Sequence, residues 1–204
     1  MKNFCFLRIS IKKKASLAIY MKRAIIIHGW GASPLFGWKP WLRKELEQKD
    51  FLVYAPQMPD THHPNMDTWV RTLQETAGKT DADLYLIGHS LGCATILRYL
   101  ETIERREKIG GAVLVAGPAK SPGYPDLENF FIKPFDWAKI KSACKKFISI
   151  HSDNDPHIPL DHGRIFEKEL GVKLIIKKGM RHFVGTGFET LPIALESVLE
   201  LSHS

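Results

Sequence analysis

The chain has 204 residues, of which 44% are hydrophobic and 25% are charged. This length and composition predict one globular domain with a sizeable core, and no apolar run approaches the roughly 18 residues that a membrane span needs. The formal net charge is +7, but five basic residues and no acidic residue lie within the first twenty, which leaves only +2 for the rest of the chain. So small an excess of positive charge does not indicate a nucleic-acid partner. We therefore predict no membrane span and no nucleic-acid partner.

Residues 1–20 are predicted to be a basic, weakly ordered extension, and residues 21–204 to be a single domain. The extension is not typical of a signal peptide, because Arg8 and the lysines at 12–14 interrupt its apolar stretches and no small-residue cleavage site follows. The three cysteines, Cys5, Cys93 and Cys144, are odd in number and widely spaced, which argues against a disulfide framework or a zinc site. Reduced thiols and a cytoplasmic location are expected, with Cys93 packed in the core.

Short β-branched runs alternate along the chain with longer segments of helical periodicity. We expect Asp67 to cap the second predicted helix and Gly171 to end the fourth. Residues 117–137 are rich in proline and aromatic residues and are predicted to be irregular. In chain order, the predicted elements are strand 24–27, helix 39–49, strand 51–55, helix 67–76, strand 84–87, helix 91–105, strand 112–116, strand 146–150, helix 160–170, strand 172–176 and helix 189–201.

The predicted strands are apolar on both faces, which is typical of a parallel sheet that helices cover on both sides. Right-handed crossovers then give a three-layer α/β/α sandwich with a mostly parallel six-stranded sheet. In such sheets the functional side chains gather at the carboxyl ends of the strands. Histidine, serine and aspartate residues follow four of the predicted strands, so we expect the functional site at that edge of the sheet.

Residues 88–92 read Gly-His-Ser-Leu-Gly, which fits the pattern G-x-S-x-G. A predicted strand leads into this segment and a predicted helix leaves it, as the nucleophile elbow of an α/β-hydrolase fold requires. The two glycines leave room for a strained turn that exposes the Ser90 hydroxyl. The alternative is a tight turn in which Ser90 only caps the following helix.

A serine hydroxyl needs a neighbouring base to become a nucleophile at neutral pH. In this fold the order along the chain is serine, acid, histidine, and His182 follows the last predicted strand and precedes the last predicted helix. Asp153 and Asp155 both follow strand 146–150, and Pro156 keeps Asp155 out of helical geometry. We predict that His182 is the base and that Asp155 orients it, with Asp153 as the alternative acid.

A metal site is the less favoured interpretation of the same region, because two prolines interrupt it. Its ligands would come from His151, Asp153, Asp155, His157 and His162. We predict no metal and no cofactor.

Acyl transfer also needs N–H donors that face the developing oxyanion. The N–H of Leu91, next to the nucleophile, and that of Trp30, in the loop after the first strand, are the candidates. His28 and Gly29 in that loop are expected to line the substrate pocket. Phe131 and Trp137 are predicted to form an apolar rim over it, with satellite core packing as the alternative for the aromatic residues of this segment.

From about residue 22 to its end, the chain resembles the retinoblastoma-binding protein 9 family of small serine hydrolases. The resemblance implies a cytoplasmic α/β hydrolase without a large cap domain, and a triad of Ser90, Asp155 and His182. His28 in the first loop departs from the family, and the motif L-x-C-x-E is absent, so retinoblastoma-pocket binding is not inferred. Besides the triad, the resemblance is carried by Gly37-Trp38 through Trp41, Lys44-Glu45-Leu46, Met58-Pro59-Asp60, the segment 131–141 with Pro134 and Trp137, and Asp155-Pro156 with Pro159.

The predicted function is hydrolysis of a small or medium carboxylic ester, or a related amide or thioester, through an acyl-enzyme on Ser90. The predicted partner is therefore a small-molecule acyl substrate. Two alternatives remain, namely a non-catalytic protein-binding module that retains the fold and an acyltransferase that excludes water.

Overall fold

The computed structural model describes residues 21–104 and 106–203, so the predicted extension 1–20 and Cys5 lie outside the described residues. Six strands form one sheet in the order β2-β1-β3-β4-β5-β6, and every neighbouring pair is parallel. The strands are β1 (Arg23–Ile27), β2 (Leu52–Tyr54), β3 (Leu84–His89), β4 (Gly111–Val115), β5 (Phe147–Ser152) and β6 (Lys173–Lys177). The helices are α2 (Lys39–Glu47), α3 (Met66–Ala77), α4 (Leu91–Leu100), the 3-10 helix η1 (Pro125–Phe130), α5 (Trp137–Ala143), α6 (Asp161–Leu170) and α7 (Pro192–Ser202).

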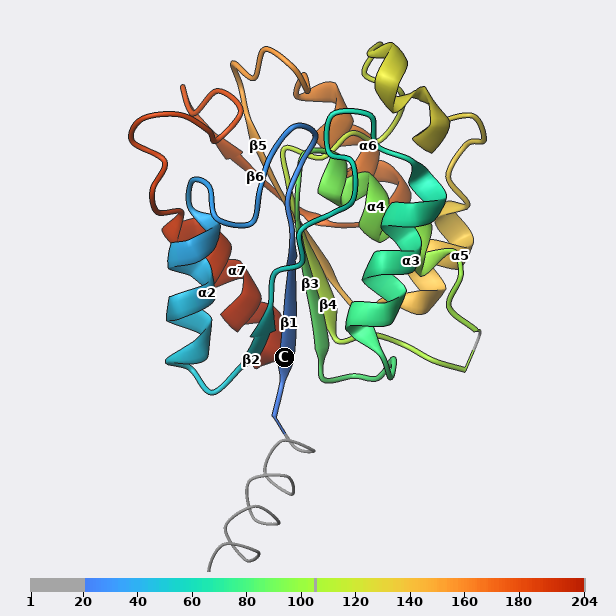
Figure 1. The fold of residues 1–204 in the computed structure, drawn as a ribbon, viewed down its shortest axis with the longest axis vertical. Helices are drawn as coiled ribbons and strands as arrows, with labels where there is room; N and C mark the ends of the chain where they lie inside the picture. Colours follow the sequence, from blue (N-terminus) through green and yellow to red (C-terminus); the bar gives the residue numbers. More distant parts are fainter. Residues whose placement is uncertain (1–20, 105, 204) are drawn as a thin grey trace, which may run out of the picture.

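Alternate residues of each central strand point to opposite faces of the sheet, and both faces are buried. In β1, Ile25 and Ile27 pack in a cluster with α3, α4, α5 and α6, whereas Ala24 and Ile26 pack in a second cluster with α2 and α7. Figure 1 shows α2 and α7 on one side of the sheet and α3, α4 and α5 on the other. The three-layer sandwich predicted from the sequence is therefore confirmed.

Three strands run further toward the site than predicted, β6 by one residue, to Lys177, and β3 and β5 by two each. β3 continues to His89 and β5 to Ser152, because His89 still pairs with Val115 and Ser152 with Lys177. These extra pairs fix the backbone that leads directly into the residues predicted to react.

Two helix-end predictions are wrong. Asn65, not Asp67, caps α3, because its extended backbone lets the side chain accept a hydrogen bond from the Thr68 N–H at 3.1 Å. The helix predicted over 91–105 ends at Leu100, where the Thr102 hydroxyl donates to the Tyr99 carbonyl at 2.7 Å. A hydroxyl bonded to a nearby carbonyl competes with continuation of the helix.

The segment after β4 is more regular than predicted. It contains η1, and α5 follows with Asp136 as its cap, whose side chain accepts from the Lys139 N–H at 2.9 Å. The predicted end of α6 is confirmed, because Gly171 is left-handed with φ 69° and its N–H donates to the Glu167 carbonyl.

Because all six strands are parallel, their carboxyl ends meet at one edge of the sheet, which is the upper edge in Figure 1. The loops after β1, β3, β5 and β6 therefore lie over one region. None of the helices in the described ranges has the length and apolar character that crossing a membrane requires.

Candidate active site

Ser90 stands at a sharp turn between β3 and α4. Its backbone is strained, with φ 54° and ψ −122°, and its N–H donates to the Val115 carbonyl at 2.9 Å. A Cβ at Gly88 would lie 2.7 Å from the Cys93 nitrogen, and one at Gly92 would overlap the Ile27 carbonyl oxygen at the end of β1. The Ser90 side chain makes no capping bond to α4, so the capping alternative is wrong, and the turn has the geometry expected of a nucleophile elbow.

Ser90 opens into a cavity of about 260 Å³ that His182 also lines. Segments far apart in the sequence form its walls, because the parallel strands end at the same edge. The lining residues are Gly29, Trp30, Ala32, His89, Ser90, Leu91, Pro118, Tyr124, Leu127, His157, Ile158, His182 and Val184.

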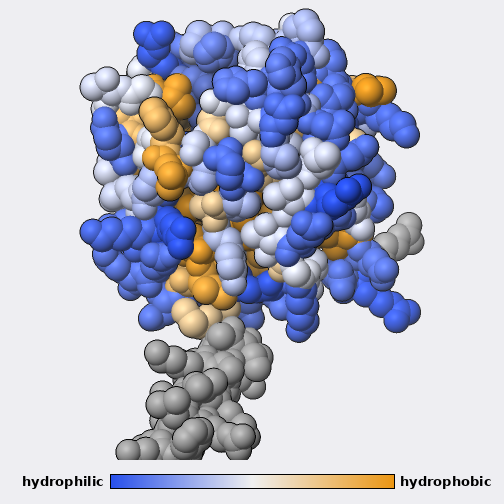
Figure 2. All heavy atoms as spheres, viewed as in Figure 1, coloured by the Kyte–Doolittle hydropathy of each residue, from blue (hydrophilic) through white to orange (hydrophobic). Residues whose placement is uncertain are grey.

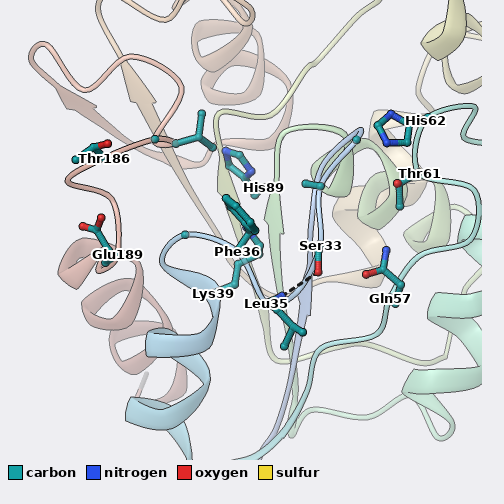
Figure 3. Close-up of a pocket in the computed structure, with 15 residues that line it drawn as sticks. Ser33, Leu35, Phe36, Lys39, Gln57, Thr61, His62, His89, Thr186 and Glu189 are labelled. Carbon is teal, nitrogen blue, oxygen red and sulfur yellow. Dashed lines mark hydrogen bonds between the residues drawn. The ribbon is translucent and has the colours of Figure 1, made fainter.

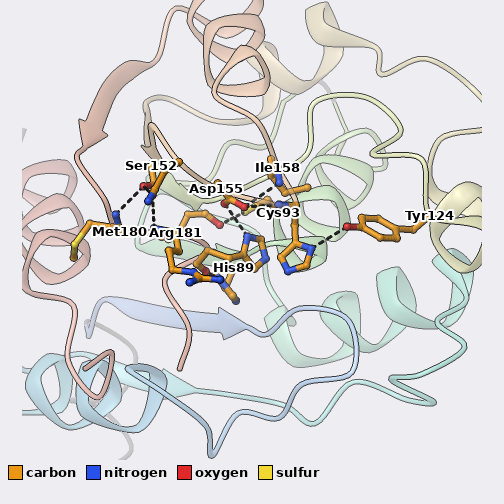
Figure 4. Close-up of polar contacts among 12 residues, drawn as sticks. His89, Cys93, Tyr124, Ser152, Asp155, Ile158, Met180 and Arg181 are labelled. Atoms are coloured by element: carbon orange, nitrogen blue, oxygen red, sulfur yellow. Dashed lines mark hydrogen bonds and ion pairs between the residues drawn. The ribbon is translucent and has the colours of Figure 1, made fainter. Parts of the chain in front are cut away.

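The structure brings His182 and Asp155 together, as predicted. His182 Nδ1 and Asp155 Oδ2 are 2.8 Å apart, and both side chains are largely buried. The second carboxylate oxygen accepts the N–H groups of His157 and Ile158, and Figure 4 shows these contacts around Asp155. Burial alone would raise the pKa of Asp155, but the hydrogen bond and charge of His182 and the two backbone bonds together hold it below its ordinary value. Asp155 is thus an ionised hydrogen-bond acceptor in contact with the imidazole of His182.

Asp153, the alternative acid, has a different role in the structure. Its carboxylate accepts the Gly179 N–H at 2.8 Å, while the Met180 and Arg181 N–H groups donate to the side chains of Ser152 and Asn154. These three bonds, of which two are drawn in Figure 4, hold the loop that carries His182 against the end of β5. The left-handed backbone of Arg181 and Phe183, on either side of His182, is maintained by this loop.

The His182 ring lies near the rings of two other histidines. The ring centroids of His89 and His157 are each 5.0 Å from that of His182. His89 Nε2 donates to the His182 carbonyl at 2.9 Å, and the His157 Nδ1 is bonded to the Tyr124 hydroxyl at 2.8 Å. Burial, with the charge of His182 as a smaller cause, lowers the pKa of His89 well below its usual value, so His89 stays neutral beside the predicted base.

The two predicted oxyanion donors both border the cavity. Leu91 is the first residue of α4, where an N–H has no partner within the helix. Among the described residues, no hydrogen bond uses the Trp30 N–H, whereas the neighbouring Gly31 N–H donates to Thr61. A Cβ at Gly29 would lie 2.9 Å from the Ser90 Cβ, so glycine is required where this loop passes the nucleophile.

Three of the predicted pocket residues do not line this cavity. His28 is fully buried; its Nδ1 donates to the Gly29 carbonyl and its Nε2 accepts the Met58 N–H, so it fixes the loop instead. Phe131 and Trp137 pack against the core cluster of the α4 face, with Phe135 between them. Phe131 and Trp137 therefore pack as part of the core and do not form a rim over this cavity.

The residues that line the cavity in their place come partly from the segment that was predicted to be a rim. η1 and the turn before it bring Leu127 and Tyr124 to the site, while Phe130 points into the core. The composition of 117–137 indicated the segment, but only the fold shows which of its residues face the cavity. The sequence pattern indicates His157 only as a possible metal ligand, and nothing in the sequence indicates a role for Val184.

Within the described ranges, no group of three histidine, cysteine, aspartate or glutamate residues is arranged to hold a metal ion. Asp155 is bonded to His182, and His162 Nδ1 accepts the Ala119 N–H. Cys93 and Cys144 are free, buried thiols, and burial raises the pKa of each, which fits the packing role expected for Cys93.

Comparison with known families agrees with this geometry. The family model described as "Serine hydrolase" matches residues 24–200, nearly the whole of the described chain, so the protein belongs to the serine hydrolase family. Its fold is that of the α/β hydrolases.

Several relatives match most of the chain. YdeN of Bacillus subtilis (strain 168) is 34% identical over 177 residues, which cover 86% of this chain and 93% of YdeN. The serine hydrolase RBBP9 of Rattus norvegicus is 30% identical over 182 residues, covering 87% of this chain and 95% of RBBP9, which confirms the resemblance found in the sequence. The crystal structure of the B. subtilis ydeN gene product superposes with a TM-score of 0.86 at 32% identity, covering 90% of this chain and all of that one. Est1E from Butyrivibrio proteoclasticus shares the fold at 16% identity, with a TM-score of 0.71 over 90% of this chain and 89% of Est1E.

Proposed function

We propose that this serine hydrolase cleaves a small or medium carboxylic ester through an acyl-enzyme on Ser90. His182 Nε2 takes the hydroxyl proton while Ser90 Oγ bonds to the carbonyl carbon, and the N–H groups of Trp30 and Leu91 stabilise the oxyanion. The single bond between this carbon and the ester oxygen of the leaving group then breaks, and His182 gives its proton to the departing oxygen. Water, deprotonated by His182, attacks the acyl-enzyme and releases the acid and free Ser90.

The observation that carries this proposal is the 2.8 Å contact between His182 Nδ1 and Asp155 Oδ2 in a cavity that Ser90 also lines. A carboxylate on Nδ1 leaves Nε2 free to accept a proton and stabilises the imidazolium that results. Among the described residues no hydrogen bond joins Ser90 Oγ to His182, although both line the same cavity. We propose that Ser90 Oγ and His182 Nε2 form this bond in the substrate complex, where catalytic hydrogen bonds commonly tighten.

The cavity supports a small or medium acyl group. Its volume of about 260 Å³ lies below the range of about 300 to 1,000 Å³ usual for drug-sized ligands. Leu127, Ile158 and Pro118 give it apolar walls, which suit a short hydrocarbon chain. Amide and thioester substrates use the same machinery and are the variants to compare with esters, and the predicted cytoplasmic location stays a prediction.

The test combines active-site labelling with ester hydrolysis. The unchanged protein should react with a fluorophosphonate probe and hydrolyse p-nitrophenyl esters, with the rate falling as the acyl chain outgrows the cavity. Ser90→Ala should lose the labelling and lower kcat by about 10³-fold or more. The exposed Ser142, changed to alanine, is the matched control and should retain both activities.

The outcomes separate the alternatives. Absence of labelling in the unchanged protein would favour a binding module over an enzyme. Labelling without hydrolysis, together with acyl transfer to an added alcohol, would favour an acyltransferase.

A further inference from the structure

A second, larger cavity adjoins the one that contains Ser90. Its volume is about 1080 Å³, and it shares Ala32, His89 and Val184 with the smaller cavity. The loops from β1 to α2, from β2 to α3 and from β6 to α7 surround it, and Figure 3 shows the side chains that line it. A substrate that reacts at Ser90 can therefore extend into this space.

The wall of the larger cavity contains a buried lysine without an acidic partner. Lys39 begins α2 and is only 2% exposed, yet its side chain borders the cavity. Among the described residues, no ion pair or hydrogen bond involves its ammonium, whose nearest described interaction is with the Trp38 ring at 5.6 Å. A buried charge without a partner is costly, and proteins rarely retain one that has no ligand.

The ammonium is charged at neutral pH and acts electrostatically on His89, which lines the cavity that contains Ser90. Burial lowers the pKa of Lys39 to about 8, so most molecules carry the charge at pH 7. Its charge in turn lowers the pKa of both His28 and His89, although burial is the larger cause for each. α2 begins without a side-chain cap and without an acidic residue in its first turn, so the positive end of the helix adds to the lysine charge.

The surroundings of Lys39 suit an amphiphilic ligand. Leu35, Phe36 and Val184 line the cavity and are exposed apolar side chains. Figure 2 shows hydrophobic residues gathered on this face, over the region that the two loops occupy in Figure 1. Glu189, the acidic residue of the lining, accepts the Gly187 N–H and makes no ion pair with Lys39. The cavity lining thus combines exposed apolar side chains and polar side chains such as those of Gln57, Thr61 and His62 with one buried lysine.

We infer that the larger cavity binds the leaving-group half of the substrate and that Lys39 binds a carboxylate carried by that half. The inference rests on the function proposed above and narrows its substrate class to esters of hydroxy carboxylic acids. The carboxylate of the leaving group is not changed in the reaction. It anchors the alcohol portion while the ester bond breaks at Ser90.

The path of the proton from His182 indicates which half of the substrate occupies which cavity. The departing oxygen must lie near His182, which returns the proton to it. The loop that follows His182, from Val184 to Thr186, forms one wall of the larger cavity. The smaller cavity surrounds Ser90 with apolar residues and suits the acyl group.

The experiment compares acetyl esters of ω-hydroxy carboxylic acids of increasing chain length with acetyl esters of the matching ω-hydroxy amides. At the chain length that reaches Lys39, the unchanged protein should prefer the carboxylate by about tenfold or more in kcat/KM, as expected for a hydrogen bond between charged groups. In Lys39→Met the ratio should fall to about one. Lys44→Met removes an exposed charge from the same helix and should keep the full preference.

Two further readouts separate ligand binding from a structural role. The free hydroxy acid of preferred length should inhibit hydrolysis of p-nitrophenyl acetate competitively, and Lys39→Met should weaken this inhibition by a similar factor. Since the substitution removes an unpaired buried charge, Tm should not fall.

Hydrolysis without a carboxylate preference, or with a preference that Lys39→Met retains, would overturn the inference and leave the proposed function intact. A preference confined to carboxylates on the acyl half would overturn the assignment of the leaving group. Failure of the unchanged protein to hydrolyse any ester would instead remove the proposed function and this inference with it.

Discussion

Two aspartates two positions apart, just after β5, form different hydrogen bonds, and these bonds distinguish their roles. Asp155 contacts the imidazole of His182, whereas Asp153 accepts a backbone N–H from the loop that carries His182. Both acids follow the same strand, so their positions along the chain alone did not decide between them.

Asp155→Asn should lower kcat for ester hydrolysis by roughly 10³- to 10⁴-fold, because an amide no longer fixes the tautomer of His182 or stabilises its charged form. Asp153→Asn retains an oxygen that accepts the Gly179 N–H and should have a much smaller effect. Steady-state kinetics with a p-nitrophenyl ester compare the two variants. A larger loss of kcat in Asp153→Asn would show that Asp153, and not Asp155, is the acid of the triad.

At the residue scale, chain order predicted that Ser90, His182 and an aspartate after β5 would meet, and Pro156 favoured Asp155 over Asp153. Ser90, Asp155 and His182 follow three different strands, and a parallel sheet brings the ends of those strands together. The pocket residues did not follow from such a rule. His28 resembled a polar pocket residue, but its two nitrogens are both used to fix backbone groups, which no spacing reveals.

The helices show how local competition sets an element's ends. Asn65 and Asp67 both have side chains suited to a cap, and the periodicity of α3 fits either start. Pro64 precedes Asn65, whose backbone is extended with φ −109° and ψ 127°, so its side chain is the one that reaches the first turn. Asp67 is instead a negative charge within that turn.

Asn65→Ala should lower the free energy of unfolding by about 1 kcal/mol through loss of the cap bond to Thr68. Asp67→Ala removes only a favourable charge near the helix N-terminus and should cost about 0.3 to 0.5 kcal/mol. Urea denaturation at neutral pH measures both values. A greater loss of unfolding free energy in Asp67→Ala than in Asn65→Ala would indicate that Asp67 caps α3, as the sequence predicts.

The elements that were missed are short. α5 has seven residues and η1 six, too few for a helical period to stand out from an aromatic-rich background. Their positions depend on packing against α4 and on the Arg98 side chain, whose Nε donates to the Phe130 carbonyl at 2.9 Å. The long, strongly periodic elements around the sheet were predictable because burial on both faces determines their composition.

Across the whole molecule, several histidines are buried in the neutral form. Burial lowers the pKa of His28, His89, His151 and His162, and that of His151 falls to about 4. His151 is fully buried against Phe166, and neither of its nitrogens has a hydrogen-bond partner among the described residues. The same core that supports the site is therefore sensitive to acid.

The sign of the pH effect follows from these directions. Below the unfolded pKa of about 6.5 the unfolded chain gains protons that the folded protein does not bind, so stability falls with pH until the folded pKa is reached. For His151 the window runs from about 6.5 to about 4, at about 1.4 kcal/mol per pH unit. Asp155 has a lowered pKa, so its contribution is present above about 3.8 and is lost only below this window.

His151→Leu should reduce the loss of unfolding free energy between pH 7 and pH 5 by about 2 kcal/mol, because the variant has one fewer buried histidine to charge. The substitution removes no hydrogen bond among the described residues, so its effect at pH 7 comes from packing alone. Urea denaturation at the two pH values gives the difference for each protein, and His203→Gln, at an exposed position near the end of α7, is the control that should leave it unchanged. If His151→Leu lost as much stability on acidification as the unchanged protein, the acid sensitivity would have to arise from the other buried histidines, and His151 would be excluded as its source.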